Sequence, residues 1–212
     1  LTRTFASYGV EHLKPAVAYV ILTVVLLLIF LIVGYPAFIA VFAHLNPFKF
    51  AKKITRVAVF GFSTSSSAAT LPLNVKTTVE ELGVDEKIAS FVLPLGMTIN
   101  MNGTAIMQVI ATLFIAGCAG YSISFTQLVV IALLALIASA GTPAAPGSGA
   151  IILFTILSGL GYVNDAAMLA YSLILAINRP IEMLVTASTR EPEQSIRSFT
   201  SHGHSRIRRR CS

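Results

Sequence analysis

Charged residues, cysteine and tryptophan are scarce or absent in this chain of 212 residues. Only 11% of the residues are charged, whereas a soluble domain of this size carries about 25%. No Asp, Glu, Lys, Arg or His occurs between Lys87 and Asp165. This shortage argues against a soluble domain, and a mean hydropathy of +0.81 with 55% hydrophobic residues predicts a membrane protein.

The two cysteines and four histidines indicate no catalytic or metal-binding centre. Cys118 and Cys211 lie too far apart in the sequence to suggest a disulfide framework or a metal-ligand spacing. The histidines lie at the ends of predicted spans or in the C-terminal tail. We therefore expect neither an enzyme nor an organic cofactor.

The first long apolar segment is an uncharged stretch from Pro15 to Ala43. A helix needs about 20 apolar residues to cross a hydrocarbon core of roughly 30 Å, so this stretch is long enough. It exceeds the apolar region of a secretory signal, about 7 to 15 residues, and lacks a cleavage-type flank. We predict a membrane span over 15–43, preceded by a truncated lead-in over 1–14.

Basic residues concentrate at two places on the chain, which has a net charge of +6. They follow the first and the last predicted span: Lys49, Lys52, Lys53 and Arg56, then Arg190, Arg197, Arg206, Arg208, Arg209 and Arg210. The positive-inside rule places both groups in the cytoplasm and the weakly charged links 122–127 and 159–164 outside. The charge is thus typical of a multi-pass cell-membrane protein, with 194–212 as a basic cytoplasmic tail, rather than of a nucleic-acid partner.

Three polar interruptions break the apolar segments. They are a serine-rich stretch at 63–72, Asn-Met-Asn-Gly-Thr at 100–104, and Gly-Thr-Pro-Ala-Ala-Pro-Gly-Ser-Gly at 141–149. In hydrocarbon every backbone N–H and C=O needs a partner, so broken helices persist only where they line a protein-enclosed cavity. The sequence therefore predicts a transporter or a channel.

The order of the segments predicts an all-α membrane protein with two re-entrant helical hairpins in an inverted repeat. An inner hairpin over 47–83 precedes an interrupted span over 88–119, and an outer hairpin over 127–161 precedes a last span over 165–187. Interrupted segments at corresponding positions of two halves indicate a transporter binding site. The alternative is that small residues at the hairpin tips merely allow close helix packing.

The interrupted span carries candidates for a cation site. Asn100, Asn102 and Thr104 surround a glycine, where unwound backbone would add carbonyl oxygens to the amide oxygens. Hard cations such as sodium prefer oxygen ligands. The alternative is an interhelical hydrogen-bond cluster.

The last span carries a polar face. Its members share one side of a helix: Asn178, Glu182, Thr186 and Thr189. An ionisable residue at membrane depth indicates a functional site. The alternative for Glu182 is a local ion pair with Arg179, and Pro180 is expected to distort this turn.

Together, the three interruptions resemble those of the sodium-coupled glutamate/dicarboxylate and neutral amino acid symporters. The similarity runs in register over 15–193, with Ser-Ser-Ser-Ala-Ala-Thr-Leu-Pro at 65–72 as its first motif. It implies a glutamate-transporter-like transport domain over 15–193 that moves against a scaffold domain in a homotrimer. It also implies sodium as the coupling ion and an amino acid or dicarboxylate as substrate. Most scaffold helices and one transport-domain helix are expected to lie outside this sequence.

By position, the resemblance implies two sets of site residues. Substrate contacts are expected from Ser67, Thr104, Ala145, Gly149, Glu182, Thr186 and Thr189. Sodium ligands, several through backbone carbonyls, are expected from Gly96, Thr98, Asn100, Asn102, Ser139, Ala140, Thr142, Thr189 and Glu193.

The chain departs from the family pattern at positions that bear on substrate and cation. Asn102 stands where the family has an aspartate, and Glu182 replaces the aspartate that binds the substrate amine. Val185 stands at the position of the arginine that holds a side-chain carboxylate, and Thr189 and Glu193 replace a later Asn and Asp. We therefore expect a secondary active symporter that favours a neutral amino acid and is driven by sodium or proton entry.

Two other classes of membrane protein are alternatives. An aquaporin-like pore would repeat Asn-Pro-Ala at its two tips, whereas Asn46-Pro47-Phe48 occurs once, in a basic loop. A truncated or divergent fragment of the same family, inactive in transport, is the stronger alternative.

Overall fold

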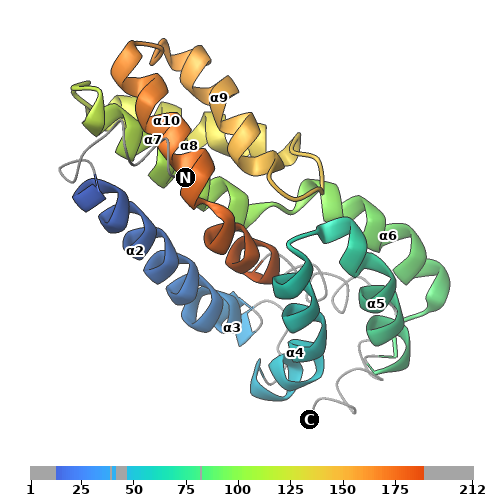
Figure 1. Ribbon diagram of the computed structural model, residues 1–212. Helices are drawn as coiled ribbons and strands as arrows, with labels where there is room; N and C mark the ends of the chain where they lie inside the picture. The colour runs from blue at the N-terminus through green and yellow to red at the C-terminus, as the bar shows by residue number, and fades with distance from the viewer. Residues whose placement is uncertain (1–12, 39, 42–46, 82, 189–212) are drawn as a thin grey trace.

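The computed structural model describes residues 13–38, 40–41, 47–81 and 83–188, and this part of the chain is helical with no strand. Its helices are α2 (Leu13–Ile29), the π-helical turn η2 (Phe30–Gly34), α3 (Tyr35–Phe38), α4 (Pro47–Thr64), α5 (Ser67–Glu80), α6 (Glu86–Ile99), α7 (Asn102–Cys118), α8 (Phe125–Ala140), α9 (Ser148–Leu160), α10 (Asp165–Ile177) and a last helix, Arg179–Ser188. Figure 1 shows α7 to α10 grouped at one end, α4 to α6 at the other, and α2 alongside. The all-α prediction is therefore confirmed.

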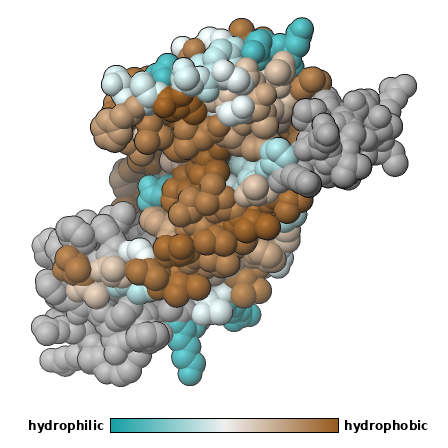
Figure 2. Space-filling view, turned by 90° about the vertical axis from the view of Figure 1, so that its left-hand side faces the viewer, coloured by the Kyte–Doolittle hydropathy of each residue, from teal (hydrophilic) through white to brown (hydrophobic). Residues whose placement is uncertain are grey.

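The N-terminal part of the first predicted span is helical, and its sequence explains which side is buried. Residues Pro15–Gly34 form a helical stretch of 20 residues with mean hydropathy 3.2, of which only 22% is buried. The buried positions recur at helical spacing: Ala16, Tyr19, Thr23 and Leu27. The remaining faces expose apolar side chains, and Figure 2 shows a broad hydrophobic surface with hydrophilic residues at its upper end. This distribution suits a helix that faces lipid.

The C-terminal part of this span departs from regular α-helix near Pro36. Proline lacks a backbone N–H, and its ring crowds the carbonyl four residues earlier, here that of Ile32. The wider turn η2 includes Ile32, and the short α3 follows it. The predicted end of the span at residue 43 lies outside the described residues.

The predicted interrupted span is Glu86–Cys118, 33 residues long, and its break is narrower than we expected. Helix α6 ends at Ile99, and α7 begins at Asn102. The prediction that backbone unwinds around the glycine was therefore wrong, because Gly103 and Thr104 belong to the first turn of α7. Only Asn100 and Met101 lie between the two helices.

The last predicted span is bent rather than straight. Helix α10 and the Arg179–Ser188 helix meet at an angle of 68°. Asn178 is the C-cap of α10 and Glu182 belongs to the next helix, yet the Glu182 N–H still donates to the Asn178 carbonyl oxygen at 3.0 Å and their side chains lie 3.4 Å apart on one face. Pro180 explains the break, since it supplies no N–H to continue the bonding of α10.

Two pairs of helices match the predicted hairpins. Helices α4 and α5 form the inner hairpin, with 65–66 as its tip, and α8 and α9 form the outer hairpin, with 141–147 as its tip. Helices α8 and α9 have 16 and 13 residues, fewer than the about 20 needed to cross a membrane. In the part of the chain that the structure describes, two helices are long and apolar enough to span, or three if the bent pair is one span.

Two glycines allow the helices to approach closely near the middle of the molecule. A Cβ atom on Gly103 would lie 2.6 Å from Ser188 Oγ and 3.2 Å from the Val185 carbonyl oxygen. A Cβ atom on Gly149 would lie 3.1 Å from both Met107 Cε and Thr104 Cγ2. Larger residues at either position would push α7 away from its neighbours.

The packing at Gly103 gives a direct test. We expect Gly103→Ala to destabilise the protein by about 1–3 kcal/mol, because the methyl group overlaps Ser188. Thermal unfolding in detergent would measure this loss, and Ser188→Ala should restore part of it by removing the closest atom. Gly159→Ala is the matched control, since a Cβ atom there meets nothing within 4 Å. An equal loss of stability in both alanine variants would contradict the packing argument.

Candidate functional site

A small polar pocket lies where the two hairpin tips meet α7 and the Arg179–Ser188 helix. Its lining comprises Ser65, Ser67, Met101, Thr104, Met107, Thr142, Pro143, Ala144, Ala145, Gly147, Ser148, Gly149, Glu182, Val185 and Thr186. Six of the predicted substrate contacts are among these residues: Ser67, Thr104, Ala145, Gly149, Glu182 and Thr186. The seventh, Thr189, lies outside the described residues. The fold therefore gathers residues from distant segments into one place.

The hairpin tips touch each other at the mouth of this pocket. The Ala144 carbonyl oxygen accepts a hydrogen bond from the Ala68 backbone N–H, with N and O 3.3 Å apart, and another from Ser66 Oγ at 3.4 Å. Within the outer tip, Ser148 Oγ lies 2.6 Å from the Pro143 carbonyl oxygen and 2.7 Å from the Ala145 carbonyl oxygen, and its hydroxyl can donate to either. The cavity left between the tips measures about 30 Å³. A buried water needs roughly 10–15 Å³ by this measure, so the space holds only about two waters.

Three helices begin at this pocket. Helix α5 starts at Ser67, α7 at Asn102 and α9 at Ser148. The N-caps of α7 and α9, Met101 and Gly147, supply no side-chain capping bond. Unpaired N–H groups and the positive ends of the helix dipoles attract anions, so this arrangement suits a carboxylate.

Glu182 is the charged member of the pocket lining in the described part of the chain. Its side chain is 9% exposed and its two carboxylate oxygens have different partners. Oε1 lies 3.4 Å from Asn178 Nδ2, and Oε2 lies 3.4 Å from Arg179 Nη1. The predicted alternative, an ion pair with Arg179, is thus present, although the Arg179 side chain is 66% exposed. Glu182 can therefore pair with Arg179 and still present a negative charge to the pocket.

The candidate cation ligands lie in two places. Gly96, Thr98, Asn100 and Asn102 flank the break between α6 and α7, whereas Ser139, Ala140 and Thr142 lie at the end of α8. Helices α6 and α8 contact each other. Of this set only Thr142 lines the pocket, while Thr98 and Ala140 are exposed. Thr189 and Glu193 lie outside the described residues.

The Asn100–Asn102 pair contains an unusual polar atom. Asn102 Nδ2 donates to Asn100 Oδ1 at 2.8 Å, and Asn100 Nδ2 is buried without a hydrogen-bond partner. Amide oxygen and nitrogen are interchangeable in such assignments. Exchanging them in both residues keeps the mutual hydrogen bond and turns the unpartnered atom into an oxygen, which is the ligand that a hard cation requires.

Sequence reasoning missed several pocket residues. Met107 is 1% exposed, lies three residues after Thr104 on the same face of α7, and accepts a hydrogen bond from Asn178 Nδ2 through its sulfur at 3.2 Å. Helical spacing from Thr104 would have identified it. Ser65 at the inner tip has φ +50°, a conformation uncommon outside glycine. Only the folded chain shows that this tip lines the pocket.

An apolar helical molecule in which two hairpin tips close over a buried polar pocket has the construction of a secondary transporter. The chain belongs to the sodium:dicarboxylate symporter family, whose sequence model matches residues 1–189. This is a family of transporters rather than enzymes, so the predicted family, membrane class and absence of enzyme activity are confirmed.

Comparison with curated proteins agrees with the family. A sodium-dependent excitatory amino acid transporter of Caenorhabditis elegans is 34% identical over 80% of this chain and 34% of its own length. Excitatory amino acid transporter 1 of Rattus norvegicus is 33% identical over 80% of this chain and 31% of its own length. Excitatory amino acid transporter 5 of Homo sapiens is 37% identical over 63% and 24%. The alignments thus cover about a third or less of these relatives.

Contact between the tips can be tested by a disulfide. In a Cys118→Ser, Cys211→Ser background, we expect Ala68→Cys with Ala144→Cys to crosslink readily under mild oxidation, because their backbones are in direct contact. Mass spectrometry of the linked peptides would measure the yield. Ala68→Cys with Gly159→Cys is the control, since Gly159 lies near the opposite end of α9. Equal yields from the two pairs would show that the tips do not meet.

Proposed function

We propose that this chain forms the substrate-binding part of a secondary active symporter that couples entry of a neutral amino acid to entry of sodium. The observation that carries this proposal is the pocket, which draws residues from both hairpin tips, α7 and the last helix. Family membership supports the transport class and sodium as the coupling ion. The names of the relatives support an amino acid as substrate.

The charges around the pocket suit the common part of an amino acid. An α-carboxylate would meet the N-terminus of α9, which borders the pocket at Ser148 and Gly149. An α-ammonium group would meet the Glu182 carboxylate on the opposite helix. The pocket can therefore bind both charged groups of a zwitterionic amino acid, because it offers anion-binding and cation-binding groups side by side.

The rest of the pocket favours a neutral side chain. Val185 is 6% exposed and lines the pocket, and among the described residues that line it there is no arginine or lysine. A second carboxylate buried there without a partner would suffer a desolvation penalty on the order of several kcal/mol. Arg179 offers little relief, since it is 66% exposed and already paired with Glu182.

Sodium binding is assigned to the helix break beside the pocket. The buried, unpartnered amide atom of Asn100 supports a cation at this point, with Asn102 as its neighbour. Thr142 is 3% exposed, and its hydroxyl oxygen keeps acceptor capacity after donating to the Ala138 carbonyl oxygen. Asn102 contributes no negative charge, so we infer a weaker demand for sodium than an aspartate there would create.

Entry of the substrate requires one tip to move. A cavity of about 30 Å³ holds about two waters by this measure, less than alanine or serine occupies, so we infer that the hairpins separate for binding. Gly147 at the outer tip has φ +84°, which glycine adopts without strain, and it precedes α9 directly. We therefore assign the outer hairpin as the lid that opens and closes over the substrate.

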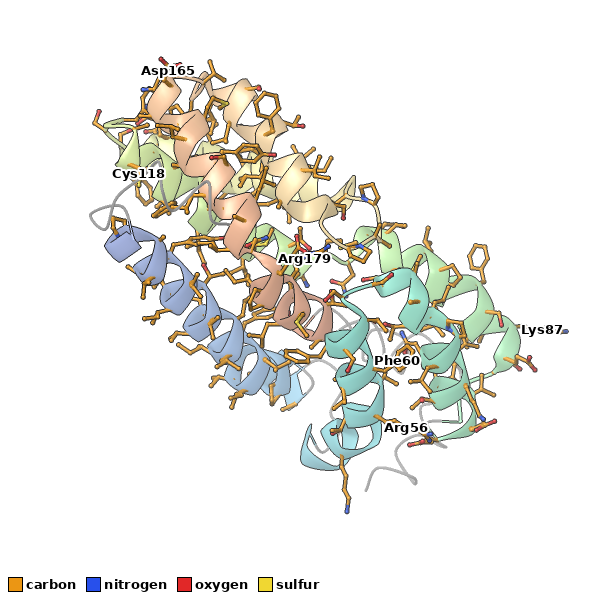
Figure 3. All side chains as sticks on the ribbon, viewed as in Figure 1. Arg56, Phe60, Lys87, Cys118, Asp165 and Arg179 are labelled. Atoms are coloured by element: carbon orange, nitrogen blue, oxygen red, sulfur yellow. The ribbon has the colours of Figure 1, made fainter. Side chains whose placement is uncertain are left out.

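The same proposal places the chain as a multi-pass protein of the cell membrane. Asp165 and Cys118 lie at one end of the molecule, and Arg56 and Lys87 lie at the other (Figure 3). Basic residues at one end and few charges between the ends support the predicted inside-outside orientation. The greater length of the relatives leaves room for the scaffold domain through which a homotrimer is proposed.

The substrate proposal predicts the effect of one substitution. On the full-length protein in proteoliposomes, calorimetry should show tighter binding of alanine or serine than of aspartate. Val185→Arg should improve aspartate binding roughly tenfold, because the guanidinium supplies the missing partner of the side-chain carboxylate. Val185→Leu is the control, since it changes the size of the side chain but not its charge.

Two results would count against this reading. Tighter binding of aspartate than of alanine by the unmodified protein would overturn the neutral preference. Absence of both binding and sodium-driven uptake would instead favour the inactive fragment over a symporter.

The cation proposal predicts a change in sodium dependence. We expect Asn102→Asp to lower the sodium concentration for half-maximal uptake by roughly tenfold, because an added carboxylate offsets the cation charge. Uptake by proteoliposomes at varied sodium would measure it. Asn164→Asp is the control, because Asn164 caps the distant start of α10 and aspartate caps equally well. An unchanged sodium dependence in Asn102→Asp would exclude this residue from the cation site.

A further inference from the structure

We propose that Tyr19, which lies outside the pocket on α2, is a positioning residue for the substrate amine. It fixes the side-chain amide of Asn178 so that this amide donates to Glu182 and holds the carboxylate in place. The inference rests on the proposed function, because it assigns Glu182 to the α-ammonium group of the substrate.

The three residues form a buried chain of hydrogen bonds. The Tyr19 hydroxyl lies 2.9 Å from Asn178 Oδ1, across 159 residues of sequence. Asn178 Nδ2 lies 3.2 Å from Met107 Sδ and 3.4 Å from Glu182 Oε1. Tyr19, Asn178 and Glu182 are 2%, 1% and 7% exposed. The low dielectric around such a chain strengthens each bond and makes an unpaired member costly.

The acceptors around Asn178 select the orientation of its amide, and the tyrosine hydroxyl, which can donate or accept, complements that orientation. The tyrosine hydroxyl donates to the amide oxygen, while the Met107 sulfur and the Glu182 carboxylate can only accept. With the amide reversed, its oxygen would face the carboxylate oxygen and repel it. Removing the tyrosine hydroxyl leaves Asn178 Oδ1 without its donor, so the amide is held less firmly against Glu182.

Tyr19 lies on the buried face of α2, whose other faces expose apolar side chains. Its ring packs against Phe114 of α7, with ring centroids 5.3 Å apart. One turn later, Thr23 is fully buried, and its hydroxyl donates a hydrogen bond to the Tyr19 carbonyl oxygen at 2.7 Å. A tyrosine hydroxyl facing the bundle at membrane depth requires a partner, and Asn178 is that partner.

The position of Asn178 explains why this orientation matters for the pocket. Asn178 ends α10 where the chain bends by 68°, and Glu182 lies in the first turns of the next helix. Glu182 also interacts with the Gly147 backbone and with Arg179, which is 66% exposed and competes with a substrate amine rather than aiming the carboxylate at it. The buried Asn178 amide therefore orients the Glu182 carboxylate through its hydrogen bond to Oε1.

The test separates the amine from the rest of the substrate. On the full-length protein in proteoliposomes, we expect Tyr19→Phe to weaken alanine binding about fivefold, which is the effect of one lost hydrogen bond. Binding of lactate, which has a hydroxyl in place of the amine, should change little, and sodium dependence should not change. Tyr171→Phe is the matched control, because Tyr171 lies on α10 and packs on Phe154 rather than on Asn178.

A double-mutant cycle tests the route through Asn178. In an Asn178→Ala background, Tyr19→Phe should cause no further loss of alanine binding. Equal weakening of alanine and lactate, or the same fivefold loss in the Asn178→Ala background, would reduce Tyr19 to a structural role. No loss at all would overturn the proposal.

A second readout needs no substrate, so failure of the proposed function would be recognised separately. Thermal unfolding in detergent of Tyr19→Phe, Glu182→Gln and the double variant should show non-additive shifts, because the two residues share Asn178. The non-additivity should vanish in the Asn178→Ala background. Additive shifts in both backgrounds would overturn the positioning chain even if the protein bound no amino acid.

Discussion

The need to pair every backbone N–H and C=O within hydrocarbon governs this structure. The helices of the described part break at 65–66, 100–101, 141–147 and Asn178. Each break frees backbone groups that lipid cannot satisfy. Residues from three of the breaks line one pocket. The fourth break, Asn178, donates a hydrogen bond to Glu182, which also lines that pocket. Bringing the breaks together lets them satisfy one another and leaves the remaining groups facing a common polar space.

Close packing by small residues makes this convergence possible. Gly103 allows the start of α7 to lie against the Arg179–Ser188 helix, and Gly149 allows α9 to lie against α7. The inner and outer tips are similarly small, so Ala68 and Ala144 meet through their backbones. Where helices have no hydrophobic drive to associate, such contact is the main source of their attraction. The pocket is therefore a consequence of packing at glycine and alanine, not of large side chains around a hole.

Polar side chains within this packed region are few, and nearly all have defined partners. The Glu182 carboxylate accepts hydrogen bonds from Asn178 and Arg179. The Asn178 amide in turn bonds to Tyr19, Met107 and Glu182. The exceptions in the described part are Thr78 Oγ1, Asn100 Nδ2 and Gln108 Oε1, which are buried without a partner. An unsatisfied polar atom at membrane depth is costly, and that of Asn100 lies at a break in the chain, where a bound cation would relieve the cost.

The sequence by itself determined the class of the protein, its apolar helices and the location of its three motifs, because hydropathy and turn residues act locally. The resemblance to the family also identified seven of the residues that line the pocket, six as substrate contacts and Thr142 as a cation ligand. Three features were decided only by the tertiary structure. They are the 68° bend at Asn178, the cavity of about 30 Å³ between the tips, and the hydrogen bond from Tyr19 to a residue 159 positions away. Each depends on which helices pack together, and the periodicity of one helix does not identify the helix that packs against it.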